Sequence, residues 1–278
     1  MVAQVDKAKS SPQLVISWEA LPDGFQLEDE PVENTGQPVL AGVLREILEI
    51  NGFFQPQMLI ASNLGVCATL NGELVIKAPD WLYVPSVLPV SGDRKSYTPN
   101  LEGEIPAVVM EFLSETDGEA YLEYSVKRTH PPGKWFFYEQ ILKVPIYVVF
   151  EPSSGLLEFY QLENGRYELK LPDENGRHWI DSMSLFLGTW QGKKEDRTGY
   201  WLRWWDESGN LLPWAVEQLE LERQQAAEQL ELQRQQAAEQ LELERQRAEK
   251  ERQQKEQLIA YLQSQGIDPS TVLGDQNT

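Results

Sequence analysis

The sequence has only one cysteine and two histidines, and this shortage limits the chemistry available to it. A single thiol, Cys67, cannot form an intramolecular disulfide, which fits a reducing compartment such as the cytoplasm. The small and apolar neighbours of Cys67 predict a buried structural thiol. His130 and His178 have no second histidine or cysteine at the spacing of metal ligands, so the sequence argues against a zinc site.

Several motifs and targeting segments are also lacking. The chain has no Gly-rich phosphate loop and no Gly-x-Ser-x-Gly turn, so neither an NTPase nor a serine hydrolase is supported. No charged segment followed by a long apolar stretch opens the sequence, and we expect no signal peptide. No apolar run approaches the roughly 20 residues that a membrane helix needs. We therefore expect a cytoplasmic protein.

Basic residues are scarce relative to acidic ones. The 278 residues include 24 Lys and Arg against 44 Asp and Glu, which gives a formal charge of −20. Such a surface repels nucleic acid unless a local basic patch overrides it. The composition therefore counts against a nucleic-acid enzyme and has to be weighed against the motifs below.

Helical and strand patterns follow one another between residues 38 and 213, after an irregular acidic arm predicted at 1–37. Residues 38–50 carry apolar side chains at helical spacing, and residues 134–142 suit a second helix. The predicted strands are 58–61, 72–76, the run opened by Asp80, the run containing Glu111, 145–150, 155–160 and 167–170, with turns at Asn71-Gly72 and Asn164-Gly165. These patterns predict an α/β domain over residues 38–213.

Two further segments lie within this predicted domain. Residues 91–105 are polar with Gly and Pro, and loops of this length in compact domains are often functional. The Trp-rich segment 179–214 is expected either to extend the sheet or to cover one of its faces.

The C-terminal part differs in kind, because residues 217–249 repeat an 11-residue unit. The repeat places Leu219, Ala226, Leu230, Ala237, Leu241 and Ala248 in one stripe. It predicts a long helix over 214–265 with a nearly straight seam. Its apolar stripe is narrow, so the helix would pair with another subunit or with the body of the protein, or else stand alone in water. Gly266 is expected to end the helix before a tail at 266–278.

Two carboxylates stand at the ends of predicted strands. Asp80 follows Pro79, and Glu111 lies within an apolar run where a carboxylate requires a partner or a metal. Two such groups with a lysine nearby, here Lys134, can hold a divalent cation and orient a water against a phosphodiester. The alternatives are ordinary ones: Asp80 as a turn residue and Lys134 as a solvated lysine at a helix start.

Several segments between about residue 37 and residue 213 stand in a characteristic order and spacing. They are Pro79-Asp80, Val109-Met110-Glu111-Phe112-Leu113-Ser114, Lys134 with Tyr138, the Pro145 to Pro152 run, and Leu185 to Gly188. By this order and spacing, rather than by one motif, the chain resembles the Uma-two family, a bacterial family abundant in cyanobacteria. This resemblance implies a restriction-endonuclease-like fold, in which a helix, a mixed sheet and a second helix form the core, with added β-hairpins and the long C-terminal helix.

The resemblance also implies a site. Asp80 and Glu111 would be metal ligands, with the backbone carbonyl of Phe112 as a third, and the metal would be Mg²⁺ or Mn²⁺. In the wider nuclease superfamily a lysine stands two residues after the glutamate, where this chain has Leu113. Lys134 would take that role, either stabilising charge on the phosphorane or lowering the pKa of the attacking water.

The segment 114–133 departs from the family pattern. It lacks the short Ser-Pro-Ser-Thr-like loop and carries four acidic residues, so it would rim the site or shift Lys134. Glu46, on the first predicted helix, is a further acidic candidate. Lys127 and Arg128 are candidate phosphate contacts or simply solvated charges.

Two hypotheses from different classes follow. The first is a metal-dependent endonuclease that hydrolyses phosphodiester bonds of DNA. The second is a catalytically inactive nuclease-fold scaffold that forms a homo-oligomer, such as a dimer, through its C-terminal helix. The first predicts that the fold gathers Asp80, Glu111 and Lys134, and the second is motivated by the charge of −20 and by the repeats.

Overall fold

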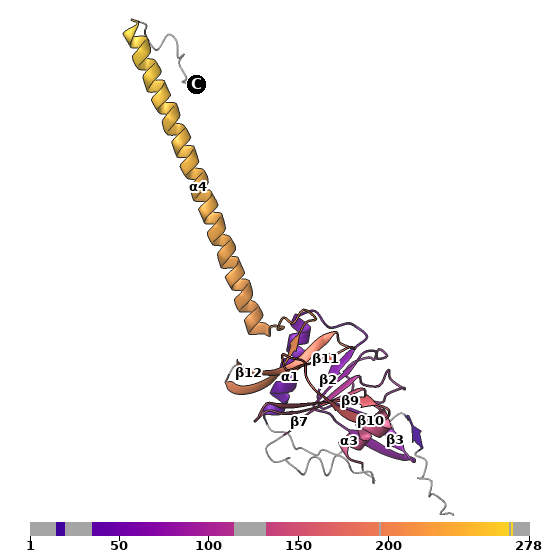
Figure 1. The fold of residues 1–278 in the computed structure, drawn as a ribbon. Helices are drawn as coiled ribbons and strands as arrows, with labels where there is room; N and C mark the ends of the chain where they lie inside the picture. Colours follow the sequence, from indigo (N-terminus) through magenta and orange to yellow (C-terminus); the bar gives the residue numbers. More distant parts are fainter. Residues whose placement is uncertain (1–14, 20–34, 114–131, 195, 267, 269–278) are drawn as a thin grey trace, which may run out of the picture. The chain divides into compact units, whose positions relative to one another are not determined.

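The computed structural model describes residues 15–19, 35–113, 132–194, 196–266 and 268. The chain divides into two compact units, Met1–Ala215 and Val216–Thr278. The elements of the first unit up to β7 are β1 (Ile16–Ser17), α1 (Gly36–Ile50), β2 (Leu59–Ala61), β3 (Gly65–Leu70), β4 (Glu73–Lys77), β5 (Trp81–Val84), β6 (Ser96–Tyr97) and β7 (Val108–Phe112). They are followed by α3 (Lys134–Phe136), the π-helix η1 (Phe137–Leu142), β8 (Ile146–Glu151), β9 (Leu156–Glu163), β10 (Arg166–Lys170), β11 (Arg177–Ile180), β12 (Leu185–Lys194), β13 (Arg197–Trp205) and α4 (Ala215–Ser264) (Figure 1).

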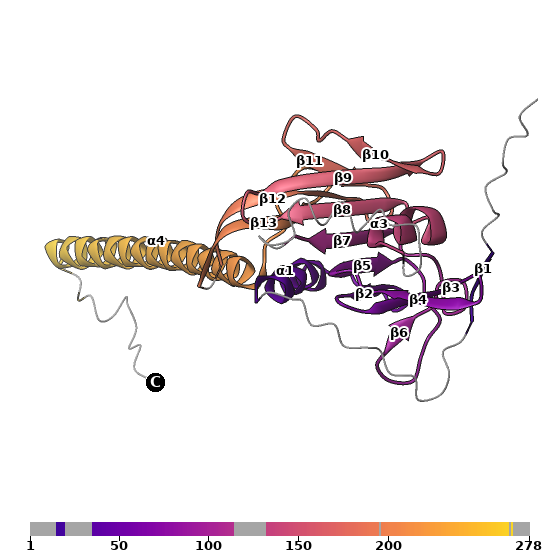
Figure 2. The same cartoon turned by 90° about the horizontal axis from the view of Figure 1, so that it is seen from below.

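A mixed sheet forms the centre of the first unit. Within the described residues its strand order is β10-β9-β8-β7-β5-β2, and the strands lie side by side in Figure 2. β7 and β8 are parallel and the other neighbours are antiparallel. A parallel pair needs a crossover connection, and here α3 and η1 lie on that connection. The fold therefore places helical residues next to the end of β7.

Side chains alternate between the two faces of this sheet, as the period of a strand requires. On β5, Trp81 and Tyr83 contribute to one core, while Leu82 and Val84 contribute to the other. The first core contains α1 and the sheet formed by β11, β12 and β13. The second contains η1 and the small sheet formed by β1, β3, β4 and β6. Of the two arrangements expected for the Trp-rich segment, the second is found, because its strands form a separate sheet over one face.

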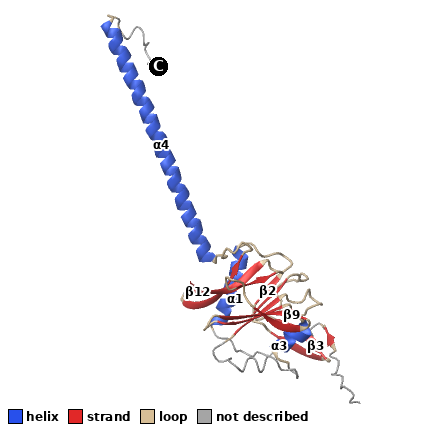
Figure 3. Cartoon of the chain, in the orientation of Figure 1, coloured by secondary structure: helices blue, strands red, loops and turns tan. Residues whose placement is uncertain are grey.

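The predicted helices are present, with one unexpected detail. The first runs over Gly36–Ile50, close to the expected 38–50. The second begins at Lys134 as expected, but its larger part, η1, has the wider π-helical turn. It ends at Leu142, and the φ of 58° of the next residue, Lys143, lies in the left-handed region. Figure 3 shows that strands predominate over helices in the first unit.

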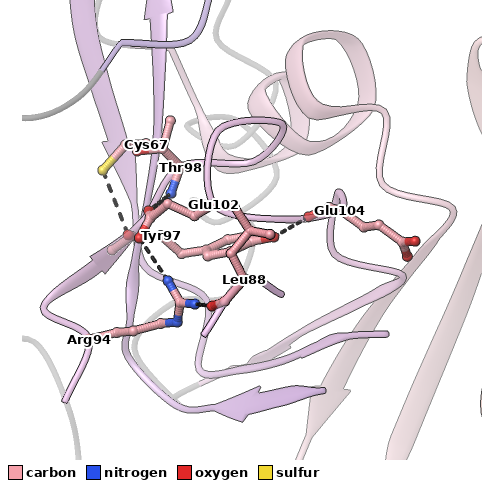
Figure 4. Close-up of polar contacts among 8 residues, drawn as sticks. Cys67, Leu88, Arg94, Tyr97, Thr98, Glu102 and Glu104 are labelled. Carbon is pink, nitrogen blue, oxygen red and sulfur yellow. Dashed lines mark hydrogen bonds and ion pairs between the residues drawn. The ribbon is translucent and has the colours of Figure 1, made fainter. Parts of the chain in front are cut away.

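The polar segment 91–105 is more ordered than the predicted loop. It contains β6, which pairs in parallel with β3. Arg94 Nη1 lies 2.7 Å from Glu102 Oε1, and the other oxygen of Glu102 accepts from the backbone N–H of Thr98 at 2.5 Å (Figure 4). The hydroxyl of the buried Tyr97 donates to the carbonyl of Glu104. These contacts give the segment a structural explanation, because its polar side chains hold its own backbone. Cys67, drawn beside them, is fully buried, as predicted.

The second unit is the long C-terminal helix that the repeats predict. Nearly all of α4 belongs to it, and Gly266, with a φ of +73°, follows the last helical turn as expected. Most of its side chains are exposed. In the described part of the chain, no helix is long and apolar enough to cross a membrane. Of the predicted arm at 1–37, the described residues 15–19 include β1, which pairs with β3.

Candidate active site

The register of β5 and β7 brings the two candidate carboxylates together. Trp81 lies opposite Met110 and Leu82 opposite Val109 in this antiparallel pair. Continued by one residue, the same register sets Asp80 opposite Glu111. Both side chains are buried, with 8% and 3% of their surfaces exposed. Opposite residues in an antiparallel pair point to the same face, so both carboxylates face the side of the sheet that η1 covers.

The peptide between Glu111 and Phe112 lies directly beside Asp80. The backbone N–H of Phe112 donates to Asp80 Oδ2 at 2.5 Å. The carbonyl of Phe112 accepts from Gln37 Nε2, also at 2.5 Å, in a buried contact. Asp80 and Gln37 thus contact the N–H and the carbonyl of Phe112, the residue that directly follows Glu111.

Glu111 is held by two residues of the following helix. Lys134 Nζ lies 2.7 Å from Oε2 of Glu111, and the hydroxyl of Tyr138 donates to Oε1 at 2.9 Å. Lys134 and Tyr138 are four residues apart, which puts them on the same side of a helix. The side chain of Lys134 keeps 33% of its surface exposed, so it is only partly buried beside this carboxylate.

The electrostatics of the site follow from burial. Removal from water raises the pKa of Glu111 to about 7, the nearby Lys134 ammonium opposes this rise, and the Asp80 carboxylate adds to it. Burial also raises the pKa of the Tyr138 hydroxyl well above its ordinary value, and Glu111 contributes. The Tyr138 hydroxyl therefore stays protonated and acts as a neutral donor. The carboxylates of Asp80 and Glu111 lie close together, so each disfavours the negative charge of the other.

The donor set fits a small hard cation in its chemistry. Two carboxylates and one carbonyl are oxygen ligands of the kind that Mg²⁺ and Mn²⁺ accept, with waters completing the shell. A carbonyl has two lone pairs, so the bond from Gln37 leaves Phe112 able to accept another partner. A cation would also offset the repulsion between Asp80 and Glu111. No group of three or more His, Cys, Asp or Glu side chains suited to a metal occurs among the described residues, so a site here depends on the backbone carbonyl.

Other sequence candidates lie elsewhere. Glu46 is not brought to this site: its carboxylate lies 3.0 Å from Lys194 Nζ and accepts from the backbone N–H of Ala215 at 2.9 Å. The interpretation of Glu46 as a site residue is therefore wrong. His178 is buried, and its ring stacks on that of Phe159. Residues 114–131, including Lys127, Arg128 and His130, lie outside the described residues, so the expectations for that segment concern residues that the structure does not describe.

Gln37 is the residue of this site that the sequence patterns missed. It precedes Leu40, Ala41 and Leu44 by three, four and seven positions, so it stands in the buried stripe of α1. A polar side chain at such a position needs a buried partner. A polar residue in an apolar stripe was therefore the available indication in the sequence. The sequence did not indicate which group would be its partner.

The mixed sheet, with a parallel pair at its centre and helices on its faces, defines a restriction-endonuclease-like fold. A family model, Uma2, described as "Putative restriction endonuclease", matches residues 40–191. Because the match covers more than half of the 278 residues, the chain belongs to the Uma2 family, which the sequence resemblance to the Uma-two family indicated. No curated protein matches the chain.

Proposed function

We propose that this protein is a divalent-metal-dependent endonuclease that hydrolyses phosphodiester bonds of DNA. The observation that supports the proposal is the bond from the Phe112 N–H to Asp80, directly beside Glu111, whose carboxylate lies 2.7 Å from Lys134 Nζ. Membership of the Uma2 family supports the class of reaction.

Each residue would have a separate task. Asp80, Glu111 and the Phe112 carbonyl would hold Mg²⁺ or Mn²⁺, which supplies a polarised water and charge neutralisation at the phosphate. Tyr138 keeps one oxygen of Glu111 in place, because its hydroxyl is a buried neutral donor. The Lys134 ammonium, partly exposed beside the carboxylate, would stabilise negative charge developing on the phosphate oxygens.

The charge of −20 sets a condition on this proposal. An acidic surface weakens the electrostatic attraction that supplies most non-specific DNA binding. We therefore expect weak DNA affinity in the absence of metal, and cleavage that falls steeply as the salt concentration rises.

Titration calorimetry with Mn²⁺ or Mg²⁺ tests the metal site first. Wild type should bind the metal, and Asp80→Asn combined with Glu111→Gln should abolish binding. Glu139→Gln is a matched control, because Glu139 is another buried carboxylate, bonded to the backbone of Tyr167 at 2.8 Å rather than to the site. Absence of binding in the wild type, or equal loss in the control, would refute the metal site.

Cleavage is measured separately, on closed circular DNA with metal and with chelator. Lys134→Met should keep metal binding but lower the cleavage rate by about 100-fold or more, the usual effect of removing a group that stabilises transition-state charge. A wild type that binds metal yet leaves DNA, linear or circular, intact would contradict the proposed activity without affecting the metal site.

A second candidate is a scaffold that self-associates through α4. The acidic surface and the exposed leucines of α4 favour it, with Leu219, Leu230 and Leu241 each about half exposed. This candidate predicts an oligomer whose mass depends on α4 and which shows no metal-stimulated cleavage. The two candidates are compatible if an active nuclease also forms a dimer.

A further inference from the structure

The repeats of α4 place charge in a definite order around the apolar stripe. The stripe consists of Leu219, Ala226, Leu230, Ala237, Leu241 and Ala248, and its three leucines are 46%, 50% and 51% exposed. With 3.6 residues per turn, the residues three and four positions after each leucine lie on opposite sides of the stripe. The edges of the stripe are thus set by those two positions in every repeat.

One edge is basic and the other acidic or neutral. The residues four positions after the stripe leucines are Arg223, Arg234 and Arg245, and those three positions after them are Glu222, Gln233 and Glu244. We name these the basic edge and the acidic edge. The order is the same in all three repeats, so the two edges run along the whole stripe.

The arginines of the basic edge make no ion pair within the described part of their own helix. A glutamate stands three positions before each of them, and Glu249 stands four positions after Arg245, which is a spacing that allows a helical ion pair. Among the described residues none of the three edge arginines has an ion pair, whereas Arg252 of the same helix contacts Glu249 and Glu256. The basic edge therefore offers three cations at fixed spacing beside an apolar stripe.

A partner for this surface must match both its period and its charges. An 11-residue repeat gives 3.67 residues per turn and a seam that is straight or slightly right-handed, so a helix with another repeat drifts out of contact. The sequence that carries the same period, the same leucines and a complementary acidic edge is α4 itself. The matching occupant is therefore a second copy of this chain.

The order of the edges also selects the orientation. In a parallel pair the basic edge of one helix faces the acidic edge of the other. In an antiparallel pair the basic edges face each other, and so do the acidic edges. Resting on the self-association proposed above, we infer that α4 forms a parallel, in-register two-helix assembly with a second copy, in which the basic edge of each helix faces the acidic edge of its partner. An antiparallel pair would set arginines against arginines.

Light scattering on the full chain tests the surface. The stripe variant (Leu219, Leu230 and Leu241 all changed to Gln) should halve the dimer mass. A matched control exists in Leu221, Leu232 and Leu243, which are equally exposed at 47%, 56% and 50% but lie two positions on, at the far side of the helix. Changed to Gln, these three should leave the dimer intact. A monomeric wild type, or equal effects of the two triple changes, would overturn the inference.

Cysteine crosslinking tests the orientation, since the native Cys67 is buried. Ala226→Cys and Ala248→Cys, studied separately, should each form a covalent dimer with itself on oxidation, and Glu228→Cys on the far side should not. In an antiparallel pair only one position along the helix lies opposite the same position of the partner helix. At most one of the two stripe variants would therefore crosslink to itself. That result would refute the parallel order while leaving self-association, and the independently measured metal site, untouched.

Discussion

Lys134 Nζ lies 2.7 Å from Oε2 of Glu111, although the two residues are 23 positions apart in the sequence. Glu111 stands on β7, at the edge of the crossover to β8, and Lys134 opens the helix on that crossover. The position two residues after Glu111 holds Leu113, which cannot supply a cation. The crossover helix thus delivers the ammonium that the strand itself lacks.

The first prediction concerns this ion pair. Lys134→Met should lower the free energy of unfolding by about 2 kcal/mol, because the buried carboxylate of Glu111 loses one of its two described partners. The cost is smaller than for a fully buried ion pair, since Lys134 is partly exposed. Urea unfolding of Lys134→Met, Glu111→Gln and the double variant gives the coupling. Costs that simply add would show that the contact contributes nothing.

The Tyr138 hydroxyl gives a second prediction. Tyr138→Phe should cost about 1–2 kcal/mol of stability, because Oε1 of Glu111 loses its donor in a buried site. Tyr167→Phe is the matched control, since the Tyr167 hydroxyl makes an equally buried bond to the Val144 carbonyl. Both changes should destabilise, but only Tyr138→Phe should weaken Mn²⁺ binding in calorimetry. Equal metal affinity in the two variants would argue against a positioning role for Tyr138.

Local patterns predicted local structure well. The Asn71-Gly72 and Asn164-Gly165 turns have the positive φ angles that suit hairpins, and the apolar runs at β7 and β8 are buried strands. Each of these features depends on neighbours within a few residues. The strand patterns indicated Asp80 and Glu111 as candidates, and the resemblance assigned both to one metal site, which no local pattern contains.

What the sequence did not predict depends on contacts between distant segments. Gln37 meets the Phe112 carbonyl across 75 positions. The π-helical turn of η1 and the short strand β6 are set by packing on the sheet rather than by propensity, which is a weak guide where tertiary contacts override it. Glu46 was misplaced for the same reason, because its partner Lys194 comes from a strand far along the chain.

Gln37 gives a third prediction, as a positioning residue for Phe112. Gln37→Met keeps the size of the side chain but removes the donor to the carbonyl, so the candidate ligand loses its fixed orientation. Loss of an outer partner of a metal ligand typically lowers metal affinity by about 10-fold or more. Calorimetry with Mn²⁺ measures this directly, and circular dichroism confirms that α1 persists. Unchanged affinity in a folded variant would remove Gln37 from the site.

His178 gives the fourth prediction, on the pH dependence of stability. Its buried ring stacks on Phe159, with centroids 4.6 Å apart and planes 4° from parallel. Burial lowers the pKa of His178, and the carboxylate of Asp173 opposes this only in part. The folded state therefore binds a proton less readily than the unfolded chain, whose histidine pKa is about 6.5.

The sign of the effect follows from this difference. The stability that neutral His178 contributes is complete above the unfolded pKa and is lost as the pH falls through the lower, folded pKa. His178→Phe keeps an aromatic ring against Phe159 but cannot take up a proton. The unfolding free energy of the wild type, minus that of His178→Phe, should therefore be constant above about pH 7.5 and should decrease on acidification below about pH 6.5. Urea unfolding across this range measures both proteins, and a difference that does not change with pH would mean that His178 keeps its ordinary pKa in the fold.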